Sequence, residues 1–144
     1  MRYWLEPRDP SRLLAAVLRE FAGPAGALSL EGRLHELPLW AFENATDQPT
    51  PPLARHTSEP LLDFLIVPLT PQNVNVAMRT TARPAAVGHA SPIVHVQVAT
   101  GPRIVFGAYD NFHPDCTFSD GLPEAALTRL QHEAIIWRFA SAIG

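Results

Sequence analysis

The amino-acid sequence predicts an α+β fold: a mainly antiparallel sheet of about six strands, with three helices packed mostly on one face. Three observations support this prediction. Several short segments alternate apolar and polar residues with the period of two that is typical of strands. Helix-start signals stand between these segments, and residues 92–109 have a strand-turn-strand pattern. Strands and helices are mixed without a regular βαβ alternation, so a doubly wound fold is disfavoured.

The amino-terminal part predicts one strand and one helix. Residues 2–6, RYWLE, alternate and indicate a short strand. Asp9 is a typical helix cap, and Pro10 suits the first helical position, where a missing N–H costs nothing. The helix ends at Gly23-Pro24. Its apolar stripe consists of Leu14, Val17, Leu18 and Phe21.

The next segment predicts strands followed by a long loop. Period-two spacing indicates a strand over 27–31, a turn or bulge at Gly32 and a weaker strand toward Leu37. Residues 41–60 contain four prolines and few large apolar groups, so they predict an irregular Pro-rich loop. A loop of this length in a compact domain is usually functional or mobile. Its PTPP segment is either a polyproline surface or a plain linker.

The central and carboxy-terminal parts predict two further helices and two further strands. The apolar run over 61–69 suits a strand that is buried on both faces. Thr70-Pro71 then opens a short helix, and Pro123-Glu124 opens another. Residues 134–139, AIIWRF, form the last predicted strand.

The hairpin over 92–109 has two apolar faces. With Thr100-Gly101 at the turn, Val98 would lie opposite Arg103 and Val96 opposite Val105. This pair of strands therefore belongs in the middle of a covered sheet, and its second face needs cover from the long loop or from a second subunit. That second face would carry Ile93, His95, Gln97, Ile104, Phe106 and Ala108.

Composition bounds the class of protein. A chain of 144 residues, 47% of them hydrophobic, fits one domain over residues 1–144. All 11 basic residues are arginine and the net charge is −3, with acidic residues among the amino-terminal arginines, so a nucleic-acid partner is not expected. The absence of lysine excludes Schiff-base chemistry and is typical of GC-rich bacterial coding.

The compartment is predicted from three features. Cys116 is the single cysteine, so an internal disulfide is impossible, which fits a reducing cytosol. The longest apolar run, residues 61–69, contains Asp63 and Pro68 and is far shorter than the roughly 20 residues of a membrane span. The amino end does not resemble a signal peptide. A soluble cytoplasmic protein with no membrane partner is therefore expected.

Reactive side chains are densest in residues 106–116, FGAYDNFHPDC. Asp110, His113 and Asp115 are candidate metal ligands, but their spacing matches no zinc motif. A nucleophilic site would use Cys116 with His113 as its base, although the acidic neighbours favour the protonated thiol. The competing interpretation is a turn built from Asx residues and proline. The weak catalytic candidates are Tyr109, Asp110, His113 and Cys116.

If the segment is only a connection, it needs its own anchors. Phe112 and Phe118 are predicted to be buried with Cys116 partly buried between them, and the polar atoms of Asp110 and His113 should bond to the loop backbone.

Two other residue types carry weaker predictions. His95, in mid-strand, is expected to be a hydrogen-bonded core residue. Trp4, Trp40 and Trp137 are expected to pack in the core or at its rim, and an exposed tryptophan would mark an interface.

The functional expectation follows from absences in the sequence. It contains no G-x-G-x-x-G, P-loop, H-E-x-x-H or G-x-S-x-G motif, and no cofactor is expected. The favoured hypothesis is a non-catalytic protein-interaction module that self-associates as a homodimer, or binds another protein, through an apolar sheet face. The alternative is a small hydrolase or metal-dependent enzyme that uses residues 106–116.

Overall fold

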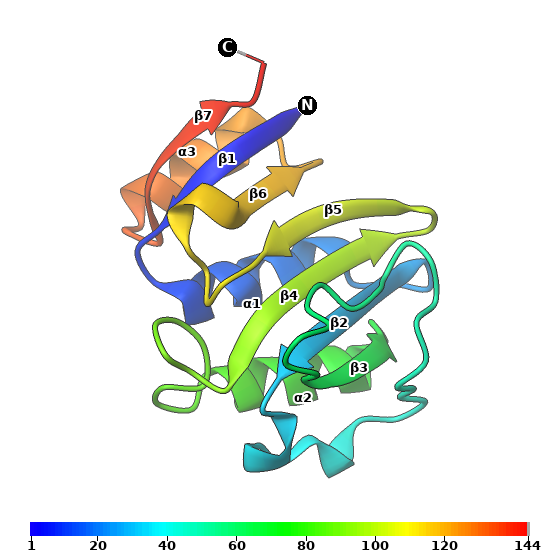
Figure 1. The fold of residues 1–144 in the computed structure, drawn as a ribbon. Helices are drawn as coiled ribbons and strands as arrows, with labels where there is room; N and C mark the ends of the chain where they lie inside the picture. The colour runs from blue at the N-terminus through cyan, green and yellow to red at the C-terminus, as the bar shows by residue number, and fades with distance from the viewer. Residues whose placement is uncertain (144) are drawn as a thin grey trace.

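A single antiparallel sheet forms the centre of the molecule. The computed structural model describes residues 1–143 and has the α+β fold that the sequence predicts, with one strand more than expected. Neighbouring strands are antiparallel throughout, in the order β3-β2-β4-β5-β6-β1-β7 (Figure 1). The strands are β1 (Arg2–Pro7), β2 (Gly26–Gly32), β3 (Asp63–Pro68), β4 (Ile93–Thr100), β5 (Arg103–Ala108), β6 (Thr117–Asp120) and β7 (Ile136–Ser141).

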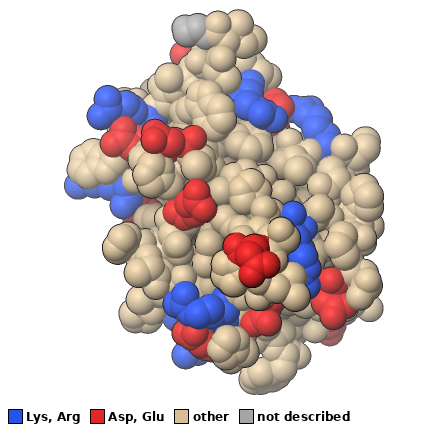
Figure 2. Space-filling view, viewed as in Figure 1, with Lys and Arg blue, Asp and Glu red and all other residues tan. Residues whose placement is uncertain are grey.

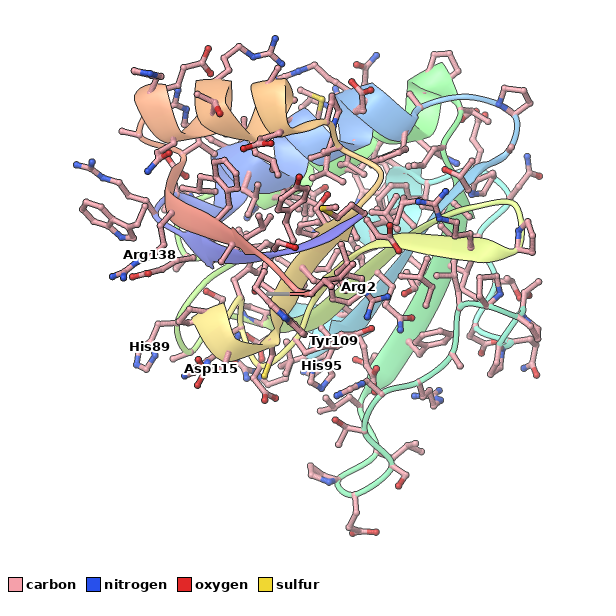
Figure 3. The ribbon with its side chains drawn as sticks, turned by 90° about the horizontal axis from the view of Figure 1, so that it is seen from above. Arg2, His89, His95, Tyr109, Asp115 and Arg138 are labelled. Carbon is pink, nitrogen blue, oxygen red and sulfur yellow. The ribbon has the colours of Figure 1, made fainter. Side chains whose placement is uncertain are left out.

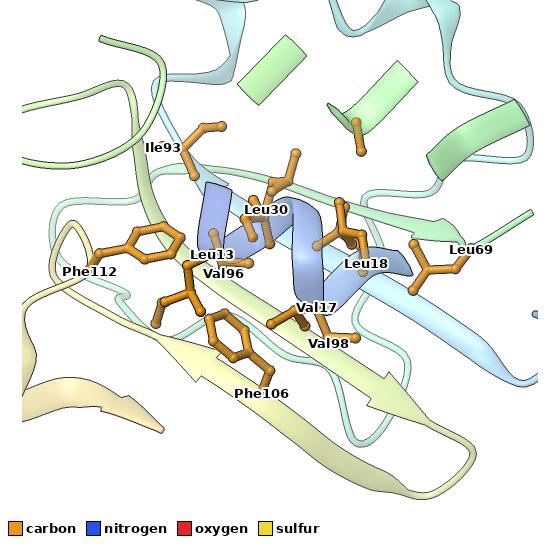
Figure 4. Close-up of a cluster of buried hydrophobic side chains, with 14 of the residues drawn as sticks. Leu13, Val17, Leu18, Leu30, Leu69, Ile93, Val96, Val98, Phe106 and Phe112 are labelled. Atoms are coloured by element: carbon orange, nitrogen blue, oxygen red, sulfur yellow. The ribbon is translucent and has the colours of Figure 1, made fainter. Parts of the chain in front are cut away.

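All three helices lie on one face of this sheet, behind it in Figure 1: α1 (Pro10–Phe21), α2 (Pro71–Thr81) and α3 (Glu124–His132). Two of them begin as the sequence predicts. The Asp9 side chain accepts a hydrogen bond from the Arg12 N–H, and the Thr70 side chain accepts one from the Asn73 N–H. Figure 4 shows α1 packed on the sheet, with its buried stripe against β4 and β5. The fully buried residues of α1 are Leu13, Leu14, Val17 and Leu18.

The hairpin of β4 and β5 lies in the middle of the sheet, as predicted, but its predicted register is wrong. Thr100 pairs with Arg103 across a two-residue turn at Gly101-Pro102, whereas Val98 pairs with Phe106. The turn lies one residue later than predicted, which shifts the pairing by two residues, and a bulge between Val98 and Ala99 shifts it by one more. Because the bulge moves Phe106 to the helix side, its ring joins the main core instead of the opposite face.

The segment after β2 also differs from its prediction. The weaker strand expected toward Leu37 is absent from this stretch, which instead forms two 3₁₀ turns, η1 (Leu34–Glu36) and η2 (Leu39–Ala41). The chain leaves the sheet at Gly32, where the pairing of β2 with β4 shifts, and the Arg33 N–H then bonds to the Pro92 carbonyl. Pro38 lacks an N–H, so this stretch is a poor strand.

The long loop covers the face of the sheet that the helices leave open. Leu53 is 2% exposed and packs with Phe64, Ile66 and Ala99 in a small second core. Thr46 exchanges two backbone hydrogen bonds with Ile66, so the loop also pairs with the outer edge of β3. The cover that the two-faced hairpin requires is therefore supplied, over β2, β3 and β4, by the chain itself.

Two further surface features bear on function. Positive and negative side chains are interspersed over the face shown in Figure 2. Within residues 1–143, none of the helices combines the length and the apolar character needed to cross a bilayer.

Candidate functional site

A polar cluster occupies the sheet face that points away from the helices. We call it the outer-face cluster; Figure 3 shows two of its members, His95 and Tyr109, on the side of the sheet opposite the helices. Its floor comes from alternate residues of two adjacent strands, which are almost completely buried although polar. Its cover comes from the end of β5 and from the long loop. The members are Ser29, Glu31, His56, Thr57, His95, Gln97 and Tyr109.

Both ring nitrogens of His95 are occupied. Nδ1 accepts a hydrogen bond from the Asp110 N–H at 3.1 Å, so the proton of the neutral ring is on Nε2. Nε2 lies 2.7 Å from the Thr57 hydroxyl oxygen and donates to it. Burial of the ring lowers the pKa of His95, and this effect outweighs the opposing influence of the Glu31 carboxylate. His95 is therefore a neutral, hydrogen-bonded core residue.

The other polar atoms of the cluster hold the long loop on the sheet. The Glu31 carboxylate accepts the N–H of His56 at 2.7 Å and that of Thr57 at 3.0 Å, one with each oxygen. The His56 ring stacks on Tyr109 with centroids 4.0 Å apart. A second bridge joins neighbouring strands, because Gln97 accepts from the Ser29 hydroxyl and donates to the Tyr109 oxygen. Since these groups already have partners, the cluster is built as a structural anchor.

The 106–116 segment does not assemble into one site. Tyr109 joins the outer-face cluster, whereas His113 Nδ1 accepts the Asp115 N–H at 3.1 Å and the Asp115 side chain is exposed. The Cys116 thiol is 3.7 Å from the Asp110 carboxylate and donates to it. Burial and the negative charge of Asp110 raise the pKa of Cys116, which disfavours the nucleophilic thiolate.

Metal binding by Asp110, His113 and Asp115 finds no geometric support. Among residues 1–143 no three His, Cys, Asp or Glu side chains are placed to hold a metal ion. Asp110 and His113 do line an open hollow of about 450 Å³, together with Arg8 and His89, but Cys116 does not line it. The candidate nucleophile therefore lies behind the Asp110 carboxylate and does not line the hollow itself.

The loop anchors are largely as predicted. Phe112 and Phe118 are 4% and 7% exposed, and Cys116 is partly buried. The two rings anchor opposite faces, since Phe112 packs on Phe106 in the main core whereas Phe118 lies over Gly107 on the outer face. His113 bonds to the loop backbone as expected. The prediction for Asp110 is wrong, because its carboxylate bonds to the Cys116 thiol.

The tryptophans lie at the rim or on the surface, and the expectation of core packing is wrong for all three. Trp4, Trp40 and Trp137 are 41%, 86% and 53% exposed, so none of them is a core residue. The Arg8 guanidinium lies 4.1 Å from the Trp137 ring centroid, and Trp4 meets Phe118 edge-on at 6.0 Å. The Arg2 guanidinium lies over the same Phe118 ring, 4.1 Å from its centroid.

Sequence reasoning missed most of the outer-face cluster. A signal for it was present: polar residues alternate with apolar ones within two strands that are otherwise apolar, at Ser29 and Glu31 in β2 and at His95 and Gln97 in β4. The partners from the loop, His56 and Thr57, carry no such pattern. Their positions depend on how the loop folds back over the sheet.

The fold and the cluster define a class of protein, an α+β domain whose buried polar groups serve to hold a covering loop. Comparison with known protein families, characterised proteins and solved structures finds no match to this chain. Function is therefore inferred from the surface of the molecule itself.

The depressed pKa of His95 makes stability depend on pH. In the unfolded chain His95 binds a proton near its ordinary pKa of 6.5, but in the folded protein it does so only at lower pH. The unfolded state thus holds more protons below pH 6.5, so the free energy of unfolding should fall as pH decreases from 6.5 toward the folded-state pKa. Urea unfolding at several pH values and an NMR titration of the ring measure this.

The exposed His132 supplies the control for this pH dependence. A His132→Gln variant should keep the acid-induced loss of stability, whereas His95→Gln should reduce it. A folded-state pKa of His95 at or above 6.5 would contradict the assignment of a neutral ring.

Proposed function

We propose that this protein is a non-catalytic interaction module of the cytosol that works as a homodimer. The observation that carries the proposal is the exposure of all three tryptophans in residues 1–143. Tryptophan is enriched at protein interfaces and dominates their binding energy, because it buries a large area with few rotatable bonds. The cytosolic location rests on the single, unpaired Cys116.

The free edge of β7 supports a second copy as the partner. The Ala142 N–H donates to the Arg2 carbonyl, so the backbone groups of Ala142 point toward β1. Because successive residues of a strand direct their N–H and C=O groups to alternate sides, those of Phe139 and Ser141 point away from β1. The opposite edge of the sheet, at β3, is covered by Thr46. The Gln131 side chain already bonds to the outward Trp137 carbonyl, so the open part of this edge is at Phe139 and Ser141. An edge strand with open backbone groups pairs readily with another chain, and two copies of β7 can pair antiparallel about a two-fold axis.

The charges beside this edge permit such pairing. Arg138 projects from β7 and forms an ion pair with Glu6 on β1, so its charge is already balanced within one subunit (Figure 3). Trp137, at the start of the same strand, offers an exposed apolar surface next to the edge. Pairing would bury part of this ring, with the Arg8 guanidinium remaining over its face as a cation–π partner.

The catalytic alternative receives less support. A hydrolase that uses residues 106–116 needs an activated nucleophile beside a base, whereas the Cys116 pKa is raised and Cys116 lies outside the hollow that contains His113. These observations favour the binding hypothesis.

Size-exclusion chromatography with light scattering at micromolar protein tests the proposal. We expect twice the mass of one chain for the wild type and a monomer for Trp137→Ser and for Ser141→Pro, which removes an outward N–H from the edge. Trp40→Ser, an equally drastic change at a distant exposed tryptophan, should remain a dimer. A wild-type monomer at this concentration, or dimers that persist in both edge variants, would refute pairing through β7.

A further inference from the structure

The third exposed tryptophan lies beside a pocket that is separate from the β7 edge. The pocket lies between η2 and α2 and has a volume of about 230 Å³. Trp40, on η2, is the most exposed of the large apolar residues. Arg79 lies in the last turn of α2 and Arg83 lies just beyond its end. The remaining lining residues are Pro38, Ala41, Val76 and Thr80.

The charge of this pocket is uncompensated. No carboxylate lines it. Within residues 1–143, neither the Arg79 nor the Arg83 guanidinium forms an ion pair, a side-chain hydrogen bond or a contact over an aromatic ring. By contrast, Arg2, Arg33, Arg103 and Arg138 are all paired with acidic groups. Each guanidinium is a planar fork of N–H donors that suits a carboxylate, and two of them line this one pocket.

The size of the pocket limits its ligand. Pockets for cofactors and drug-sized ligands usually measure about 300–1,000 Å³, so this one is smaller. The volume of the pocket suits one side chain of a peptide. The flat Trp40 ring beside the pocket can pack against an apolar side chain next to it in the peptide. Tryptophan and arginine are also the residue types that contribute most binding energy at protein interfaces.

We propose that this pocket binds an acidic peptide of a partner protein, with a glutamate or aspartate side chain held by Arg79 and Arg83 and an adjacent apolar residue against Trp40. The peptide site is independent of the homodimer proposed above, because no residue of β7 lines it. The protein would then join two copies of itself to two copies of an acidic partner.

The three tryptophans provide the readout. In a ¹H–¹⁵N spectrum of the full chain each indole N–H gives one signal, and Trp40→Phe assigns the signal of Trp40. The probe is an acetylated hexapeptide with one glutamate flanked by leucines; a glutamine version and inorganic phosphate serve as comparison probes. We expect the glutamate peptide to shift the Trp40 signal in a saturable way, with the signals of Trp4 and Trp137 unchanged.

Charge-matched variants make the test specific. Arg79→Gln/Arg83→Gln should weaken binding of the glutamate peptide by roughly tenfold or more, since two charge-assisted hydrogen bonds are lost. Arg19→Gln/Arg129→Gln removes the same charge from two exposed arginines outside the pocket and should bind as the wild type does. Trp137→Ser should also bind normally, whether or not it dimerises.

Four results would overturn the proposal. They are an unchanged Trp40 signal at millimolar glutamate peptide, an equal response to the glutamine peptide, an equal response to phosphate alone, and equal weakening in the two double-arginine variants. The first two would show that no carboxylate is recognised. The third would indicate a general anion site, and the fourth a dependence on net charge alone.

Discussion

Phe112→Ala is expected to lower the free energy of unfolding by about 3–5 kcal/mol, the usual cost of removing a buried phenylalanine ring. The ring is 4% exposed and packs on Phe106 in the main core, so its loss leaves a cavity between the loop and the sheet. Phe112 has a φ of +62°, and alanine keeps the same Cβ, so the backbone strain is equal in both proteins. The decrease in the free energy of unfolding therefore measures the contribution of the Phe112 ring alone.

Thermal unfolding measures this change directly. For a domain slightly larger than this one, each kcal/mol lowers Tm by about 2–4 °C, so a decrease in Tm of about 6–20 °C is expected. Asp115→Ala is the control, because that side chain is exposed in the same loop and its removal should change stability by no more than about 0.5 kcal/mol. A tolerated Phe112→Ala would mean that the loop is not anchored by the core and would reopen the catalytic hypothesis.

Gly32→Ala is expected to destabilise the protein by about 3 kcal/mol or more, above the usual range for an extra methyl group in a packed interior. A Cβ at position 32 would lie 2.0 Å from the Pro92 carbonyl oxygen and 2.9 Å from the Val94 nitrogen. Both atoms belong to the backbone, so no side-chain rotation relieves the collision. To relieve the collision, β2 and β4 must move apart at the bulge between Glu31 and Gly32. This movement would also disturb Glu31, whose carboxylate holds the long loop.

Gly101→Ala is the control for this prediction. It shows how much stability is lost when only the backbone conformation favours glycine and an added Cβ collides with nothing. Gly101 has a φ of +58° in the β4–β5 turn, and nothing lies within 4 Å of an added Cβ. Its substitution should cost only about 1–2 kcal/mol, the ordinary penalty of a left-handed residue. Urea unfolding of both variants gives the comparison, and a smaller loss for Gly32→Ala than for Gly101→Ala would contradict the close approach of β2 to Pro92.

The reactive residues of the 106–116 loop show why the candidate site could not be predicted from chain proximity. Asp110, Asn111 and Phe112 all have positive φ, so the chain winds sharply and sends successive side chains in different directions. The turn is held by distant groups: the Asp110 N–H bonds to His95, and the Asn111 side chain donates to the carbonyls of Ser91 and Ile93. Residues that are neighbours in sequence thus serve different faces of the sheet.

The sequence by itself determined the features that depend on local interactions. Asp9-Pro10 and Thr70-Pro71 specify helix starts because caps act within one turn of the chain. The hairpin was placed in the middle of a covered sheet because both of its faces are apolar, and the prolines of residues 41–60 excluded regular structure.

Only the tertiary structure decided the register, the polar cluster and the exposed tryptophans. The bulges at Gly32 and at Val98/Ala99 arise from the fit of neighbouring strands, and each one changes which side chains enter the core. Strand β6 is only four residues long, and its backbone completes the hydrogen bonding between β5 and β1. Glu31 is charged but buried, and Trp40 is apolar but exposed, so hydrophobicity alone predicts neither position. The burial of each residue depends on whether a segment that is distant in sequence packs over it.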